Sequence, residues 1–393
     1  MTEWLKIYRR QDWILLGAAL GLCTLGILFI FSATYQGPGV PMPRVWMKQA
    51  LWLGIALVGY LLMIQVNPTW LIRMGPILYA IGVVLLVLVA LVGTELNEGR
   101  RWLRLGPFIL QPSEFVKISN LVLLAYLLGE VDVRPPNLAR VFSCLFWVGI
   151  PLVLVILQPD LGTALVFLPS ALGLLFLAGM RWRHLFLLAS MAFLAVLPIL
   201  FQLVHYFRFF YPQLQLNPGL SAPWWYLLKP YQCNRILVFL DPNFDPYNAG
   251  WNLLQCKIAV GSGGYAGKGF LQGSQNLLGF LPRPVAPTDF IFSVLAEELG
   301  FRGVLLLVGL YLVLLTRLIM IGLRCRQEPS RSLLAGGIAI IFFCHIFVNL
   351  GMTIGLMPIT GLPLPLMSYG GSFLLGSMLA LGMVQAVFVR RGP

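Results

Sequence analysis

The chain has 393 residues, of which 59% are hydrophobic and only 10% are charged. Because a soluble globular domain carries about 25% charged residues, a chain of this composition needs the bilayer as its solvent and is predicted to be an integral membrane protein. The formal net charge is +13, but the Lys and Arg residues are scattered between apolar segments, a pattern that sets membrane topology and argues against nucleic-acid binding.

Ten apolar segments reach the length of about 20 residues that a membrane-spanning helix needs. The first follows basic residues, exceeds the apolar core of a signal peptide and has no small-residue cleavage site, so it is predicted to be a retained helix. The expected fold is an all-α polytopic membrane protein with about ten transmembrane helices, in a single domain over 1–393. In chain order the segments are 13–35, 45–66, 71–93, 113–131, 142–158, 162–180, 184–205, 290–320, 333–357 and 371–389.

Two joints and one loop depart from this regular pattern. Gln158 to Gly162 predicts a tight hairpin, and the Pro- and Gly-rich run from Pro358 to Gly371 predicts a re-entrant or loop segment. The large loop at about 206–289, between helices 7 and 8, mixes aromatic stretches with Pro and Gly turns. We expect parts of this loop to lie on the membrane surface or dip into it.

The basic residues predict the orientation. Ten spans place both ends of the chain on one side, whose loops hold Lys6, Arg9, Arg10, Arg73, Arg134, Arg140, Arg181, Arg183, Arg317, Arg324, Arg326, Arg331, Arg390 and Arg391. The short loops opposite hold only Arg44, Lys48, Arg100, Arg101 and Arg104. The positive-inside rule therefore predicts that both termini are cytoplasmic and that the large loop is extracytoplasmic.

The Cys and His residues show no metal-site pattern. None of the Cys residues forms a C-x-x-C pair or has a His partner at zinc spacing. Cys233 and Cys256 share the large loop, where a disulfide between them and two free thiols are the alternatives. His184, His205 and His345 are isolated in the sequence and are predicted to be interfacial or packing residues.

Charged residues at membrane depth cost a few kcal/mol each, so they indicate function by default. Glu114 and Lys117 lie three residues apart at the start of a span, on one helix face, where they can pair and where the helix N-terminus favours an anion. One interpretation is a structural ion pair that makes insertion tolerable. The other adds Arg101, next to Trp102, as a phosphate clamp.

Two further features lie between spans. Asp160, in the hairpin, is interpreted either as the N-cap of the next helix or as a functional carboxylate. The Gly-rich run 261–269 fails as a nucleotide-binding P-loop, because Ser262 stands where the first Gly should be and Gly269 replaces the Ser or Thr. With Lys268, its backbone could approach a phosphate; a plain loop of turns is the alternative.

The last cluster begins the eighth span. Asp289 is expected at its outer end, with Glu297 and Glu298 two to three turns deeper. A partly desolvated carboxylate at this boundary can have a raised pKa and act as a general base, whereas Asp289 alone would be a helix cap. Adjacent Glu residues point about 100° apart on a helix, so Glu297 and Glu298 should not share one role. Together the three predict a functional cavity, in which Glu297 and Glu298 are expected to bind the substrate.

These clusters, in this order on a ten-span frame, resemble the SEDS family of peptidoglycan glycosyltransferases. The run Met357–Ser372 is close to the family signature, and its Thr-Gly-Leu-Pro-Leu-Pro form is more similar to the elongation branch, RodA, than to the division branch, FtsW. The resemblance covers nearly the whole chain. One departure is the stretch Leu281–Pro287, which lacks the Glu and His that members of the family commonly carry before Thr-Asp-Phe.

The resemblance implies polymerisation of lipid II at the outer face of the bacterial inner membrane, with Asp289 in the position of the family's essential Asp. It also implies substrate-binding roles for Arg101, Trp102, Glu114, Lys117 and Asp160, and for Lys48, which precedes Gln49. The implied partners are the nascent glycan chain, a class B penicillin-binding transpeptidase and the elongation machinery. A divalent cation, Mg²⁺ or Mn²⁺, held between Asp289 and a pyrophosphate would need no separate metal motif.

In the expected mechanism, Asp289 removes the proton of a GlcNAc 4-hydroxyl, MurNAc C1 inverts, and undecaprenyl pyrophosphate leaves. Its charge would be met by Lys48, Arg101, Lys117 or Lys268. One alternative is a flippase or transporter for the same lipid, which would need polar residues along a path through the whole bilayer. Another is a non-catalytic scaffold that only recruits the transpeptidase.

Overall fold

The computed structural model describes residues 7–96, 99–106, 108–129, 136–217, 219–246 and 249–390. Lys6, Arg134 and Arg391, which enter the charge count above, lie outside these residues. Every predicted apolar segment coincides with helix, because a backbone in lipid must satisfy its own N–H and C=O groups. The third segment is broken into α4 and α5 at Gly75-Pro76, where Pro is tolerated in the first turn of the new helix.

The helices that correspond to these segments have the following bounds: α2 Trp13–Thr34, α3 Val45–Gln65, α4 Pro68–Arg73, α5 Gly75–Val92, α6 Pro112–Gly129, α7 Leu138–Leu157, α8 Leu161–Leu177, α9 Trp182–His205, α14 Ile291–Arg324, α15 Pro329–Ile354 and α16 Gly371–Val389. Within the described residues, eight helical segments are long and apolar enough to cross a membrane. The helix α8, with 17 residues, is shorter, and α6 is not among the eight. The multi-pass membrane fold is therefore confirmed, and the count of ten stays a prediction.

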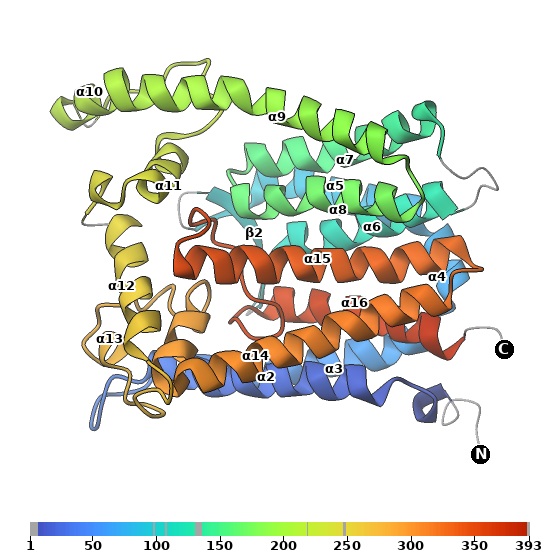
Figure 1. Ribbon diagram of the computed structural model, residues 1–393, viewed down its shortest axis with the longest axis horizontal. Coiled ribbons are helices and arrows are strands. Elements are labelled where there is room, and N and C mark those ends of the chain that lie inside the picture. The colour runs from blue at the N-terminus through green and yellow to red at the C-terminus, as the bar shows by residue number, and fades with distance from the viewer. Residues whose placement is uncertain are drawn as a thin grey trace.

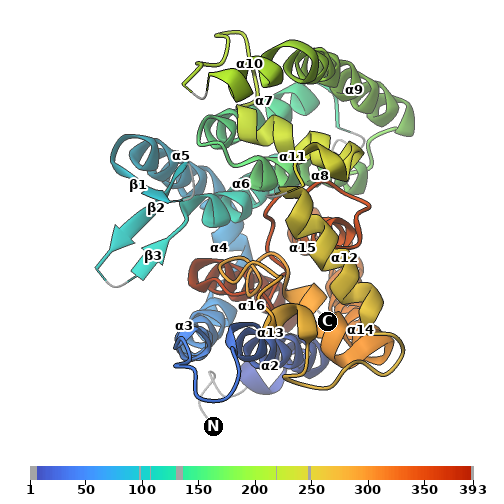
Figure 2. The ribbon, with the colours of Figure 1, turned by 90° about the vertical axis from the view of Figure 1, so that its left-hand side faces the viewer.

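The long helices run side by side and define two ends of the molecule (Figure 1). We call the end where α2 begins and α16 ends the terminal end. At the opposite end, the loop end, lie the short helices of the large loop: α10 Tyr211–Leu216, α11 Pro230–Leu240, α12 Ala249–Ser262 and α13 Ser274–Leu277 (Figures 1 and 2). The large loop thus forms helices that cover one end of the bundle.

The fold is predominantly helical, as expected, and contains one small element that the sequence did not predict. Between α5 and α6 the chain forms an antiparallel three-stranded sheet of β1 Thr94–Leu96, β2 Gly99–Leu105 and β3 Phe108–Leu110. Figure 2 shows it beside the bundle. β2 and β3 pair antiparallel, with Leu103 opposite Leu110 and Leu105 opposite Phe108, and Gly106, with φ of +60°, lies in the turn between them. The sheet carries Arg101 and Trp102.

The alternative of a Cys233–Cys256 disulfide is wrong, because both side chains are free thiols. They belong to different apolar clusters: Cys233 on α11 packs with Leu203 and Tyr206 of the α9 region, whereas Cys256 on α12 is part of the main core. Separate packing keeps the two sulfurs apart.

The chain between α15 and α16, residues 355–370, is an irregular and largely buried segment that we call the inserted segment. It starts at Gly355, whose φ of +79° ends α15 in the left-handed region that favours glycine. The Gln49 side chain holds its far end, donating to Ser368 O at 3.2 Å and accepting from Gly370 N at 3.1 Å. The predicted re-entrant or loop segment is thus non-helical backbone enclosed by protein, as the bilayer requires.

Candidate active site

A cavity of about 260 Å³ lies at the loop end, between α8, α9, α11 and the inserted segment. Its wall is mostly apolar and includes Leu161, Leu165, Val196, Ile199, Leu228, Ile236 and Ile359. Its polar lining consists of Arg101, Tyr231, Gln232, Arg235 and Thr360. We call it the arginine cavity, because it combines two guanidinium groups with a surface suited to a hydrocarbon chain.

Arg101 reaches this cavity from strand β2. Its guanidinium donates to Gln158 O at 3.1 Å, to Pro159 O, and to the Tyr231 hydroxyl at 3.2 Å. The Asp160 carboxylate lies 4.0 Å from Arg101 Nη1. The predicted hairpin therefore binds the Arg101 guanidinium through two backbone carbonyls. These contacts hold the guanidinium at the wall of the arginine cavity.

Asp160 is the N-cap of α8, as one of its two interpretations predicts. It accepts from Thr163 N at 3.1 Å and from Thr163 Oγ1 at 2.8 Å. Gln111 Nε2 donates to Asp160 Oδ2, the same oxygen that accepts from Thr163 Oγ1, at 2.9 Å. Capping and the contact with Arg101 occupy this carboxylate, and a substrate-binding role for it stays a prediction.

Asp289 lies two residues before α14, at the loop end, and faces the inserted segment. A Cβ added to Gly361 would lie 3.5 Å from Asp289 Oδ2 and 3.7 Å from Arg235 Nη1, so both charges converge on this glycine. Burial raises the pKa of Asp289 to about 6, while the Arg235 guanidinium and a hydrogen bond from Thr288 lower it and the Asp160 charge raises it. This carboxyl group is therefore poised to exchange a proton near neutral pH.

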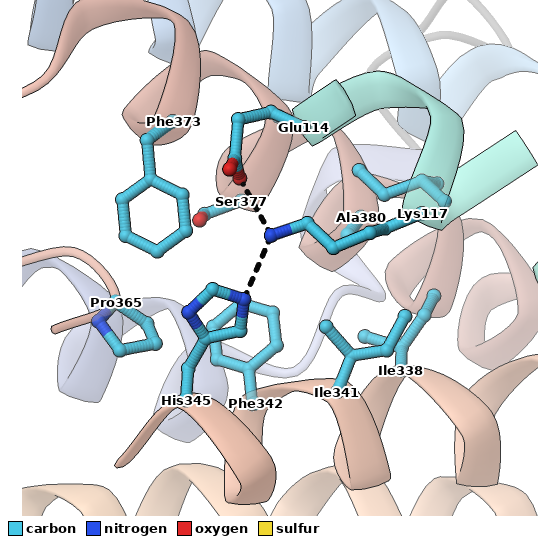
Figure 3. A pocket seen from close by; sticks show the side chains of 12 residues that line it. Glu114, Lys117, Ile338, Ile341, Phe342, His345, Pro365, Phe373, Ser377 and Ala380 are labelled. Carbon is cyan, nitrogen blue, oxygen red and sulfur yellow. Dashed lines mark hydrogen bonds and ion pairs between the residues drawn. The ribbon is translucent and has the colours of Figure 1, made fainter. Parts of the chain in front are cut away.

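Glu114 and Lys117 form the predicted ion pair deeper in the bundle. Lys117 Nζ lies 2.9 Å from Glu114 Oε2 and 2.8 Å from His345 Nε2, and all three side chains are at most 5% exposed. Figure 3 shows the three groups converging from α6 and α15, with Phe373 and Pro365 beside them. His345 and His205 are isolated in the sequence but have polar partners in the structure: Lys117 for His345, and the Tyr226 hydroxyl, 2.8 Å from Nδ1, for His205.

Glu297 and Glu298 have separate partners, as their spacing predicts. Glu297 is fully buried and accepts from Lys268 Nζ at 2.6 Å and from Gln275 N at 3.0 Å. Glu298, on the next face of α14, accepts from the Ser32 hydroxyl of α2. These carboxylates connect α14 to its neighbours, and the structure does not bring them to the arginine cavity lining.

The Gly-rich run 261–269 packs against a kink in α14. Gly300 has φ of +62° inside this helix, and the N–H groups of Lys268 and Gly269 donate to the carbonyls of Glu297 and Glu298 at 3.0 and 2.9 Å. A Cβ on Gly267 would lie 2.1 Å from Glu298 O, so the glycine permits this close approach. These backbone donors are engaged by α14, which supports the loop interpretation over a phosphate cradle.

Lys48 and Trp102, like the other predicted substrate-binding residues apart from Arg101, do not line the arginine cavity. Lys48 is an exposed residue of α3, next to the buried Gln49 that holds the inserted segment. Trp102 pairs with Thr94 in the sheet and its carbonyl accepts from Thr94 Oγ1 at 3.2 Å. Their proposed roles stay predictions.

Sequence reasoning missed Arg235 and His345. Arg235 interrupts the apolar stretch of α11, but the position of a residue inside the long loop 206–289 could not be predicted from sequence spacing. His345 carried a signal, since an ionisable residue within a span indicates function by default. Its partner Lys117 lies 228 residues earlier, which only the tertiary structure shows.

Among the described residues, no group of three or more His, Cys, Asp or Glu side chains lies together in a way that could hold a metal ion. At this position Asp289 would be the single protein ligand of a metal ion. A divalent cation there would need the remaining ligands from a substrate's phosphate oxygens and water.

Comparisons with known proteins agree with this architecture. The family model for FtsW, RodA and SpoVE, described as a cell cycle protein, matches residues 12–391. Peptidoglycan glycosyltransferase MrdB of Escherichia coli K12 is 37% identical over 99% of this chain and 96% of its own length. Peptidoglycan glycosyltransferase RodA of Treponema pallidum is 34% identical, over 97% of this chain and 98% of its own.

Solved structures give the same result. A chain from a study of the structural coordination of polymerization and crosslinking by a peptidoglycan synthase complex has a TM-score of 0.74 and 33% identity, with 96% of this chain and 97% of that chain covered. The crystal structure of Thermus thermophilus Rod shape determining protein RodA has a TM-score of 0.67 and 30% identity, with 96% of each chain covered. The chain therefore belongs to the FtsW, RodA and SpoVE family, the SEDS family that its motifs resemble.

Proposed function

We propose that this protein is a peptidoglycan glycosyltransferase that polymerises lipid II into glycan strands during cell elongation. One observation carries the proposal: the Asp289 carboxylate and the Arg235 guanidinium meet at Gly361, and Arg235 also lines the apolar arginine cavity. A base, a cation and a hydrocarbon-binding wall are the three elements that transfer from a lipid pyrophosphate requires.

In the reaction, a sugar hydroxyl oxygen attacks the anomeric carbon of the lipid-linked sugar while its bond to the pyrophosphate oxygen breaks. Asp289 takes the hydroxyl proton, and attack from the opposite face inverts C1. The leaving pyrophosphate needs no general acid, because its charge is stabilised by cations placed where that charge develops.

Arg101 and Arg235 are the cations that we assign to this pyrophosphate. Lys117 and Lys268, which the sequence also suggested, each contact a buried carboxylate, at 2.9 and 2.6 Å, and do not line the arginine cavity. A guanidinium offers a planar fork of donors that suits phosphate oxygens, and the cavity wall beside it accepts an undecaprenyl chain.

A divalent cation, Mg²⁺ or Mn²⁺, would fit beside Asp289 only if the substrate's pyrophosphate supplied further ligands. When bound, it would add positive charge at the leaving group. The roles assigned above to Asp289, Arg101 and Arg235 do not depend on it.

The chain is a multi-pass membrane protein, and we place it in the bacterial inner membrane with the loop end outside and both termini in the cytoplasm. The positive-inside count supports this orientation. The partner we propose is a class B penicillin-binding transpeptidase of the elongation machinery, supported by the relative solved as part of a complex for polymerization and crosslinking.

The test is polymerisation of purified lipid II by the reconstituted protein, with and without its transpeptidase and a divalent cation. Asp289→Asn should insert and fold normally yet form no glycan chains. Asp241→Asn, which changes an exposed carboxylate of the same loop, is the matched control and should polymerise normally. Undiminished chain formation by Asp289→Asn would refute the base assignment.

The transporter alternative is tested in the same vesicles. Movement of labelled lipid II across the bilayer without polymer would support transport. A scaffold that only recruits its partner predicts that Asp289→Asn changes neither polymer yield nor cell shape.

A further inference from the structure

Helix α15 presents two polar side chains to the inserted segment, one helical turn apart. His345 Nδ1 lies 3.2 Å from Pro363 O, and Asn349 Nδ2 donates to Leu362 O at 2.7 Å. The same Asn349 amide donates to the backbone carbonyl of Asp289 at 2.9 Å. Two residues on one helix face thus hold two successive carbonyls of the inserted segment and the backbone of Asp289.

The contact with Lys117 fixes the state of His345. An ammonium group has donors and no acceptor, so His345 Nε2 must accept from Lys117 with its lone pair. The ring proton then sits on Nδ1 and donates to Pro363 O. The Glu114–Lys117 pair therefore selects the one tautomer of His345 that can bind the inserted segment.

Asn349 uses only the amide nitrogen of its side chain in these contacts. Its side chain is fully buried, both carbonyl contacts use the amide nitrogen, and its Oδ1 has no hydrogen-bond partner among the described residues. A buried unpaired acceptor costs about 1–3 kcal/mol, so the residue carries a penalty to provide two donors. A hydroxyl or carboxylate could not satisfy both carbonyls in this way.

We propose that His345 and Asn349 are positioning residues for Asp289, an inference that rests on the proposed function. Asp289 precedes α14: its N–H donates to Val285 O at 3.0 Å, and its carbonyl accepts from the Asn349 amide. Its neighbour Gly361 belongs to the irregular inserted segment. Asn349 ties the two backbones together, and His345 holds the next carbonyl of the inserted segment in line. The Glu114–Lys117 pair acts on the site through this histidine, which lies nine residues, or about 14 Å along α15, before the end of the helix at Ile354.

The experiment compares matched variants in lipid II polymerisation by reconstituted protein. His345→Leu and Asn349→Leu replace the donors with an apolar side chain. Gln385→Leu is the control, since Gln385 is equally buried and makes two backbone hydrogen bonds, at 2.9 and 2.8 Å, to Asp12 near the terminal end. His345→Gln is the rescue, because its amide can accept from Lys117 and donate to Pro363.

Positioning predicts that kcat falls at least tenfold in both Leu variants while KM for lipid II stays within about twofold, since a displacement near 1 Å can cost about 100-fold in rate. His345→Gln should recover most of the lost kcat, and Gln385→Leu should keep it. If Asn349→Leu does not fold, Asn349→Asp replaces it, because its side chain has the same shape and no amide donor. Its kcat should also fall at least tenfold.

Two results would overturn the proposal: kcat within twofold of the parent in both Leu variants, or a fall that only follows thermal stability and is equal in Gln385→Leu. A failure of the proposed function gives a different result, namely full activity of Asp289→Asn. If Asp289→Asn is inactive and both Leu variants have normal activity, the proposed function stands and only the positioning role is refuted.

Discussion

Arg235 of α11 and Asp289 before α14 converge on Gly361, within 3.7 Å and 3.5 Å of where its Cβ would be. The guanidinium lowers the pKa of the Asp289 carboxyl, which burial raises to about 6. Arg235 thus has two effects in the proposed reaction: it keeps the base ionised at neutral pH and it supplies charge to the arginine cavity.

The pH dependence follows from this pair. A general base must be ionised, so polymerisation should fall to roughly half its maximum near pH 6 and further below it. Arg235→Gln removes a charge that lowers the pKa of Asp289, and the acidic limb of the pH–rate profile should move to higher pH. Arg208→Gln, an exposed Arg of the same large loop, is the control. An unmoved limb in Arg235→Gln would contradict the coupling.

Gly361→Ala should damage the site without exchanging a charged group. Gly361 has φ of +75°, where a residue with a Cβ costs about 1–2 kcal/mol, and the new methyl would sit beside Asp289 and Arg235. Since a 1 Å misplacement at the reacting centre can cost about 100-fold in rate, we expect the smaller shift caused by this methyl to lower polymerisation about tenfold. Gly54→Ala on α3, whose Cβ would meet nothing within 4 Å, should have normal activity. Equal activity of the two variants would argue against close packing at Gly361.

Lys268→Met distinguishes a structural cation from a substrate ligand. Lys268 pairs with the fully buried Glu297 at 2.6 Å, and removal of one member of such a pair costs about 3 kcal/mol, because the remaining charge is buried alone. The thermal midpoint in detergent should fall markedly, and the double variant Lys268→Met/Glu297→Gln should recover most of it. A phosphate ligand would behave in the opposite way, with lost activity and an unchanged midpoint.

The thiol state can be counted directly. All six Cys side chains are free, and burial raises the pKa of Cys233 and of Cys256 to about 12. Both should react slowly with maleimide in the folded protein, because the thiolate is the nucleophile. After denaturation without reductant, mass spectrometry should show the same number of labelled thiols as after reduction. Two fewer labels would indicate the disulfide that the structure excludes.

The apolar segments determined much of the fold by themselves. Because lipid requires every spanning backbone to satisfy its own hydrogen bonds, length and hydropathy located α2, α3, α14 and α16 to within a few residues. The Pro- and Gly-rich run after α15 was also predictable, since it cannot continue a helix. The three-stranded sheet was missed because its strands are only 3 to 7 residues long, too short for a periodicity to stand out.

The sequence by itself also determined which residues are costly in a membrane, and hence Asp289, Glu114, Lys117, Glu297 and Glu298 as candidates. It determined the pairing of Glu114 with Lys117, because three residues on a helix place both on one face. Only the tertiary structure decided the other partners: Lys268 for Glu297, His345 for Lys117, and Arg235 and Asn349 for Asp289. Those contacts join helices far apart in the chain, and no local spacing encodes which side chains meet when helices pack.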